Sequence, residues 1–63
     1  MNSEIWRAFG ILPCEVLGVA CWEVVRDGVR LGLANTERAA IDIARAIQRR
    51  EGGIILTWSD VAF

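Results

Sequence analysis

The sequence contains no histidine and no lysine, and it has only two cysteines and one proline. Without histidine, the chain lacks the most common general base and the most common metal ligand in proteins. Two cysteines alone do not complete the four ligands of a structural zinc site. The remaining hydroxyl, thiol and carboxylate groups form no motif of nucleophile and base. We therefore expect no enzymatic activity, no metal site and no cofactor.

An excess of charge of either sign is also lacking. Seven basic and eight acidic residues give a formal net charge of −1 and a pI of about 5.2. This balance gives little attraction to phosphate backbones or anionic membranes. Acidic residues and Pro13 interrupt the apolar stretch of residues 9–25, and Glu4 stands where a signal peptide would carry a base. We expect a cytoplasmic protein that does not contact a membrane.

Apolar residues are abundant for so short a chain. The 63 residues are 54% hydrophobic, which is above the usual fraction of about 45–50%. A domain of this size buries only about 60% of the surface that its unfolded chain exposes. The excess apolar surface therefore needs a partner, and the sequence predicts a homodimer.

The clearest local signal is Asp27-Gly28, which lies between two runs of β-forming residues. Asp-Gly readily takes the positive φ angles of a two-residue type I′ turn, so residues 22–26 and 29–33 are predicted to form a hairpin. Such a short turn fixes the register, with Arg26 opposite Val29. This register places four apolar side chains on one face of the sheet: Trp22, Val24, Leu31 and Leu33.

The apolar period changes to that of a helix after residue 35. Thr36 is a good N-cap, basic residues occupy the last turn, and Gly52-Gly53 ends the helix. The stripe expected to pack on the sheet is Ala40, Ile43, Ala44 and Ile47. Ile41 falls off this stripe and is expected on the exposed side.

Residues 54–58 are predicted to form a third strand, apolar on both faces except at Thr57. The simplest topology is β-β-α-β, in which the last strand pairs antiparallel with the first, in spatial order 2-1-3. The predicted fold class is α+β: a three-stranded antiparallel sheet with one helix on one face, formed by residues 19–63. For residues 1–18 the sequence favours an apolar N-terminal arm or short helix, with an added strand ahead of Gly18 as the alternative.

Three segments carry a resemblance to a known family: residues 22–28 (WEVVRDG), residues 36–50 (TERAAIDIARAIQRR) and the glycine pair that follows. Together they make the chain similar to the small bacterial domain of unknown function called DUF2188 over about residues 20–58. The resemblance implies the same β-β-α-β order and brings no catalytic motif. The sequence departs from the family at Ala39, where a glutamate is frequent, and after Leu56. Residues 1–18 have no counterpart in the family.

The leading functional hypothesis is a non-catalytic protein-protein interaction module that binds a protein partner. The use of arginine without lysine suits GC-rich coding, so we expect an accessory protein of a bacterium or a phage, including a phage-encoded inhibitor of a host defence or transcription complex. Large apolar side chains near the termini and on the helix are the candidate protein interface, because such groups are enriched at interfaces. They are Trp6, Phe9, Ile41, Trp58 and Phe63.

The alternative is a nucleic-acid-binding module that uses an arginine stripe on the helix. Its candidate contacts are Arg38, Arg45, Arg49 and Arg50, which Asp42 and neighbouring acids partly offset. Arginines at the end of a helix are more often a solvated face that complements the helix dipole, so this hypothesis ranks second. Cys14 and Cys21 lie seven residues apart, which matches neither a CxxC redox pair nor a metal-binding knuckle. The sequence favours small, buried and reduced cysteines.

Overall fold

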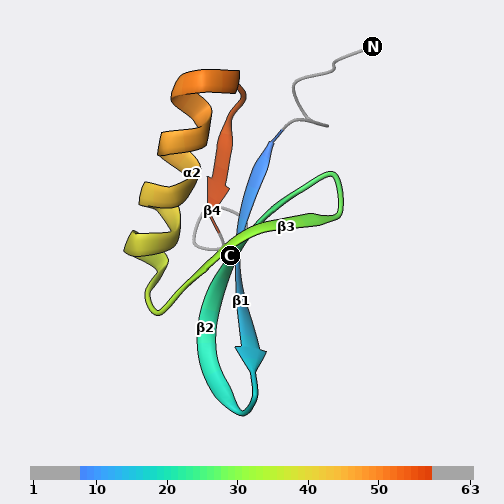
Figure 1. Cartoon of the computed structure of the whole chain (residues 1–63), viewed down its shortest axis with the longest axis vertical. Coiled ribbons are helices and arrows are strands. Elements are labelled where there is room, and N and C mark those ends of the chain that lie inside the picture. Colours follow the sequence, from blue (N-terminus) through green and yellow to red (C-terminus); the bar gives the residue numbers. More distant parts are fainter. Residues whose placement is uncertain (1–7, 58–63) are drawn as a thin grey trace.

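The computed structural model describes residues 8–57 of the chain. Within this part, the elements are β1 (Phe9–Val16), β2 (Val19–Arg26), β3 (Val29–Ala34), α2 (Glu37–Glu51) and β4 (Ile55–Thr57). The strands form one sheet in the spatial order β3-β2-β1-β4, and α2 packs along it (Figure 1). The predicted α+β class, with antiparallel strands and a helix packed on them, is confirmed.

The predicted turn between β2 and β3 is present. Asp27 and Gly28 have φ angles of 54° and 77°, as a type I′ turn requires. Arg26 pairs with Val29, also as predicted. The turn chemistry of Asp-Gly was therefore sufficient to locate this hairpin.

The register predicted beyond the first pairs of this hairpin is wrong by one residue. A bulge lies between Val24 and Val25, so that Val24 pairs with Gly32 and not with Leu31. The bulge shifts Leu33 opposite Glu23, onto the other face of the sheet, where Leu33 is 42% exposed. Gly32 lies instead under the helix, where an added Cβ would approach Ile43 Cγ2 to 3.1 Å.

Much of residues 1–18 forms a strand, so the predicted arm or short helix is wrong for this part and the alternative of an added strand is correct. β1 pairs antiparallel with β2 along its whole length, from Gly10 opposite Val25 to Val16 opposite Val19. The domain boundary predicted at residue 18 falls inside the turn of this hairpin. Residues 1–7 lie outside the described residues.

The last strand also has a different neighbour from the one predicted. Because β1 occupies the position beside β2, β4 pairs with β1, and it does so parallel, with Phe9 opposite Ile55. The direction of β4 still follows from the helix, which returns the chain along the sheet so that β4 runs parallel to β3. The pairing ends at Ile11 opposite Thr57, so Pro13 lies beyond it, where a missing N–H group removes no bond to β4.

The helix follows its sequence signals closely. The Thr36 hydroxyl accepts a hydrogen bond from the Ala39 N–H at 3.1 Å, and Gly52 ends the helix with a φ of 75°. The Gly52 N–H donates to the Gln48 carbonyl at 2.7 Å, which satisfies one of the last carbonyls of the helix. No helix within residues 8–57 is both long and apolar enough to cross a membrane.

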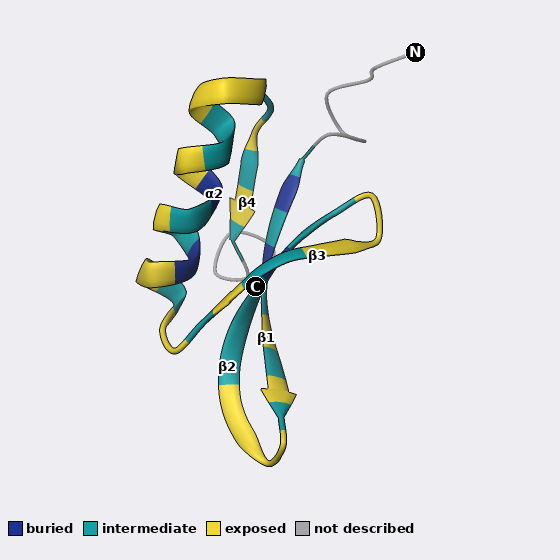
Figure 2. Ribbon diagram, viewed as in Figure 1, coloured by how far each residue is buried: buried dark blue, intermediate teal, exposed yellow. Residues whose placement is uncertain are grey.

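The core lies between α2 and the central strands, as the dark blue segments of Figure 2 show. Its fully buried residues are Phe9, Ile11, Val24, Ala40 and Ala44. Ile43 and Ile47 pack against this cluster together with Trp22 and Leu31, so the predicted packing stripe of the helix is confirmed. A salt bridge of 2.9 Å between Arg26 and Glu51 adds a second link between the sheet and the end of α2.

Candidate functional site

The face of the sheet opposite α2 is covered by none of the elements in residues 8–57. Ile11 and Val24 are paired and buried under the helix, so the next residues along β1 and β2 point the other way. We call this uncovered face of the sheet the open face. Its members are Leu12, Cys14, Val16, Val19, Cys21, Glu23, Val25, Arg30, Leu33 and Leu56. The open face is mainly apolar, which is unusual for a sheet surface in contact with water.

The turn between β1 and β2 carries the most exposed large apolar side chain of the described residues. Leu17 is 98% exposed, and it takes a φ of 52° with Gly18 at 81°. These angles define the same kind of turn as Asp27-Gly28, but leucine is a poor residue for it because its Cβ crowds the backbone at positive φ. The turn lies beyond the end of α2, at the far end of the longest axis of the molecule (Figure 1). A strained, fully exposed leucine at a projecting tip has no evident role in folding.

A shallow hollow lies beside this tip. It has a volume of about 210 Å³ and is lined by Val16, Val19, Cys21, Leu33, Ala34 and Asn35. Four of these six residues belong to the open face, and Val19 is itself 61% exposed. The hollow is therefore an apolar depression of the open face, next to the projecting Leu17.

One ion pair lies within the open face. Arg30 donates from Nε and Nη2 to one carboxylate oxygen of Glu23, at 3.1 and 2.9 Å. The side chain of Glu23 is 19% exposed and that of Arg30 is 50% exposed, so solvent screens the pair only partly. The pair gives an apolar surface one acidic and one basic group, which a docking partner would have to match.

Cys14 and Cys21 lie directly opposite each other on the open face. Both are free thiols, and their Sγ atoms are 3.1 Å apart, in hydrogen-bond contact. The hydrogen bond to Cys21, with smaller contributions from burial and from the charges of Cys21 and Glu23, raises the pKa of Cys14 to about 11. The Cys14 thiol is therefore protonated at neutral pH and is a weak nucleophile there.

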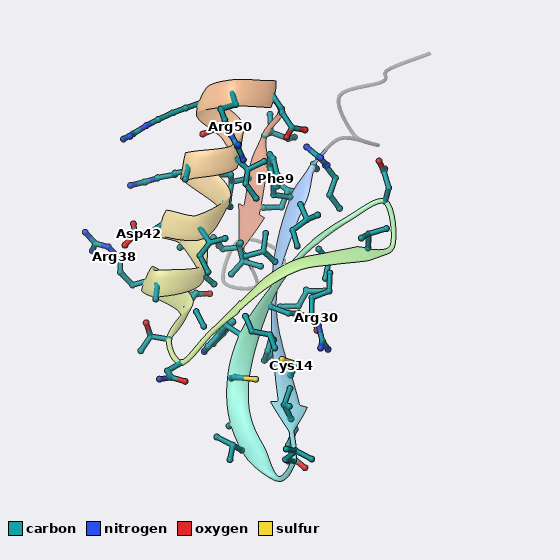
Figure 3. The ribbon with its side chains drawn as sticks, viewed as in Figure 1. Phe9, Cys14, Arg30, Arg38, Asp42 and Arg50 are labelled. Carbon is teal, nitrogen blue, oxygen red and sulfur yellow. The ribbon has the colours of Figure 1, made fainter. Side chains whose placement is uncertain are left out.

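The arginines of the alternative hypothesis lie on α2. All four of them, Arg38, Arg45, Arg49 and Arg50, are exposed. Arg38 and Asp42 extend from the side of the helix that faces away from the sheet (Figure 3). Among the described residues, the ion pairs join Arg26 to Glu51 and Arg30 to Glu23, and none involves these four arginines.

Of the five residues predicted as a protein interface, the structure describes two, Phe9 and Ile41. Phe9 is fully buried in the core, because β1 carries it under the helix, so it is not available to a partner. Ile41 is half-buried and packs against the core cluster, so its predicted exposure is wrong. The helix contacts all four strands, so the side of α2 that packs on the sheet includes residues beyond the predicted stripe. Trp6, Trp58 and Phe63 lie outside the described residues.

The sequence does not predict the open face, because for residues 1–18 it favours an arm or short helix and gives an added strand only as the alternative. The available signal was Leu17-Gly18, where a glycine follows an apolar run and the two cysteines stand symmetrically on either side. A leucine in the first position of a type I′ turn is rare, so the pattern did not read as a turn. Within the described residues, no three His, Cys, Asp or Glu side chains lie close enough to hold a metal ion.

Comparison with protein-family models, curated proteins and solved structures finds no match to this chain. The resemblance to DUF2188 therefore stays a prediction, although the observed order from β2 to β4 is the order that it implies.

Proposed function

We propose that the protein is a non-catalytic interaction module that binds through its open face, and that the first occupant of this face is a second copy of the chain. The observation that carries the proposal is Leu17, which is 98% exposed at a φ of 52°. A leucine in this conformation costs roughly 1–2 kcal/mol relative to glycine. Asparagine or glycine would make the same turn with less strain, so the leucine is best explained by what it contacts outside its own fold.

The open face suits a second copy because it is complementary to itself. It presents a projecting apolar side chain, Leu17, beside an apolar hollow of about 210 Å³. In a two-fold dimer, both copies use the same patch, and each contact between two different residues across the interface occurs twice. Two-fold packing near the hairpin tip would seat each Leu17 in the hollow of the other copy.

The charges of the face are also self-complementary. A two-fold axis through the open face would bring Arg30 of one copy near Glu23 of the other, so that two intrachain pairs become an alternating group of four charges. The chain carries a net charge of only −1, so whole-molecule repulsion opposes association very little. The opposite charges on the open face and the small net charge of the chain favour a second copy over a strongly charged partner.

The site chemistry supports binding rather than catalysis. The thiol of Cys14 is the most perturbed titratable group described, and its pKa of about 11 makes it less reactive at neutral pH, not more. Enzymes that use cysteine lower the pKa of the nucleophile by a nearby base or cation. The perturbation here has the opposite sign.

The test is the molar mass of the protein across a dilution series, measured by sedimentation equilibrium. We expect a monomer-dimer equilibrium for the wild type, and a dissociation constant at least tenfold weaker for Leu17→Asn. Val29→Thr is the matched control, because Val29 is 57% exposed but lies on the same side of the sheet as Arg26, away from the open face. A wild type that stays monomeric at hundreds of micromolar would refute self-association, and equal weakening by both variants would refute the assignment to the open face.

Nucleic-acid binding is the second candidate, and one observation favours it: Arg38, Arg45, Arg49 and Arg50 are all exposed on α2 without a described ion pair. Asp42 lies among them, and the net charge of the chain is negative. If these arginines bind phosphates, affinity for RNA or DNA falls steeply between low and moderate salt, and Arg45→Glu with Arg49→Glu abolishes it. The bacterial or phage origin, and the role as a phage-encoded inhibitor, rest on composition and class-level analogy and stay predictions.

A further inference from the structure

We infer that Cys14 and Cys21 are a modification site, at which mild oxidation forms a reversible disulfide across the β1-β2 hairpin. The inference concerns the chain by itself and does not depend on the proposed dimer. Its basis is the register of the sheet, which makes Cys14 and Cys21 direct partners on adjacent antiparallel strands. The two-residue turn at Leu17-Gly18 fixes that register. The two cysteines are equally far from the turn along the chain, so they lie opposite each other.

The strand pairing is compatible with a disulfide between the two residues. Directly opposed residues in an antiparallel pair have Cα atoms about 4.5–5.5 Å apart, which lies inside the range of about 4.4–6.8 Å found in disulfides. The two Sγ atoms are 3.1 Å apart as free thiols, so both side chains already point at each other. Forming the bond, whose length is about 2.05 Å, requires the two Sγ atoms to move closer together by about 1 Å.

The thiols are also reachable by a small oxidant. Both cysteines are half-buried on the open face, and Cys21 lines the hollow beside the hairpin tip. Hydrogen peroxide is a sufficient oxidant for this reaction. One thiolate attacks the peroxide, giving a sulfenic acid and hydroxide, and the second thiolate then attacks the sulfenic sulfur and releases a second hydroxide. The two hydroxides take up the two protons that the thiols lost. In total, two thiols and one hydrogen peroxide give one disulfide and two water molecules, and a dithiol reductant reverses the change.

The same surroundings set the rate. The raised pKa of Cys14, about 11, keeps its thiol protonated at neutral pH and makes its reaction slow there. The reaction is therefore expected to accelerate as the pH rises toward that value. The product would join β1 to β2 in the middle of the open face and fix the projecting hairpin that carries Leu17.

The experiment treats the full chain with one equivalent of hydrogen peroxide and follows intact mass, free thiols and thermal unfolding. We expect a chain lighter by two hydrogen atoms, no alkylatable thiol, and a melting temperature raised by roughly 5–15 °C, all reversed by dithiothreitol. The control Cys14→Ser retains one thiol and should show neither the mass loss nor the reversible rise in melting temperature. A second variant, Cys21→Ser, repeats the control if the first one folds poorly.

Three results would overturn the inference. The first is that both thiols remain alkylatable after treatment while free glutathione in the same tube is oxidised. The second is a gain of oxygen atoms on each thiol without loss of hydrogen, which would mean that the sulfurs react singly. The third is a disulfide between two chains, seen as doubled mass in denaturant without reductant. The oxidation is carried out at a concentration below dimer formation, so that failure of the disulfide and failure of the dimer are distinguished.

Discussion

At the residue scale, two turns of the same geometry differ in one position. Asp27 and Leu17 occupy the first place of equivalent two-residue turns, with φ angles of 54° and 52°. Aspartate suits this conformation, because its side chain bonds to nearby backbone groups, whereas leucine has no such compensation. The turn between β1 and β2 therefore contains a residue that its own backbone conformation disfavours.

Leu17→Asn is therefore expected to stabilise the monomer by about 0.5–1 kcal/mol, since asparagine takes positive φ with less strain. Chemical denaturation at a concentration below dimer formation measures this change. The reciprocal variant, Asp27→Leu, should lose a similar amount. If Leu17→Asn proves destabilising, Leu17 packs within its own fold and the interpretation of the tip is wrong.

A second prediction at this scale concerns alkaline pH. The chain has no lysine and no tyrosine, and the pKa of the Cys14 thiol is raised from 9.0 to about 11 by its hydrogen bond to Cys21. The folded state keeps the Cys14 proton to about pH 11, whereas the unfolded chain releases it near the ordinary value of 9.0. The folded state then binds more protons in this window, and the free energy of unfolding falls as the pH rises through it.

This fall is measured by thermal unfolding under a reducing agent from pH 8 to 11. The variant Cys14→Ser lacks the titrating group, so its melting temperature should vary less over the same range. Identical profiles for both proteins would show that the contact between the two thiols does not perturb Cys14.

At the scale of elements, those specified by neighbouring residues can be predicted from the sequence, and those that depend on contacts between distant segments cannot. The helix and the β2-β3 turn are specified by adjacent residues, a cap at Thr36, a glycine at Gly52 and the Asp-Gly pair, so the sequence locates them. The bulge in β3 depends on how close α2 comes to the sheet, which no local pattern encodes. The partner of β4 depends on whether β1 exists, and the rarity of Leu17 in a turn concealed that strand. Phe9 was assigned to the candidate interface for the same reason, since it enters the core only as part of β1.

The bulge predicts that alanine is tolerated differently at two glycines of the sheet, Gly32 and Gly10. An alanine at Gly32 would place its Cβ 3.1 Å from Ile43 Cγ2, whereas an alanine at Gly10 would meet the Val25 carbonyl oxygen at an ordinary 3.7 Å. Gly32→Ala is expected to destabilise the fold by about 1–2 kcal/mol, and Gly10→Ala to be neutral or slightly stabilising. Denaturation midpoints of both variants check this. Equal tolerance at the two positions would mean that α2 does not approach the sheet at Gly32.

At the scale of the whole molecule, one helix covers one face of a four-stranded sheet. Among residues 8–57, the fully buried large side chains are those of Phe9, Ile11 and Val24. So small a core leaves little stability to spare, and covering the open face would add apolar burial that the elements within residues 8–57 do not provide. We propose different roles for the two faces: the covered face holds the fold together, and the open face is the surface for association.

The most direct measurement of that claim uses the charges of the open face. In Glu23→Arg, two copies would oppose arginines across the two-fold axis, and in Arg30→Glu they would oppose glutamates, so each variant should associate more weakly than the wild type. An equimolar mixture of the two restores opposite charges across the interface. We predict that sedimentation equilibrium finds each variant monomeric at a concentration where the wild type is dimeric, and finds dimers again in the mixture. A mixture that stays monomeric under these conditions, or single variants that dimerise as well as the wild type, would contradict the open face as the site of association.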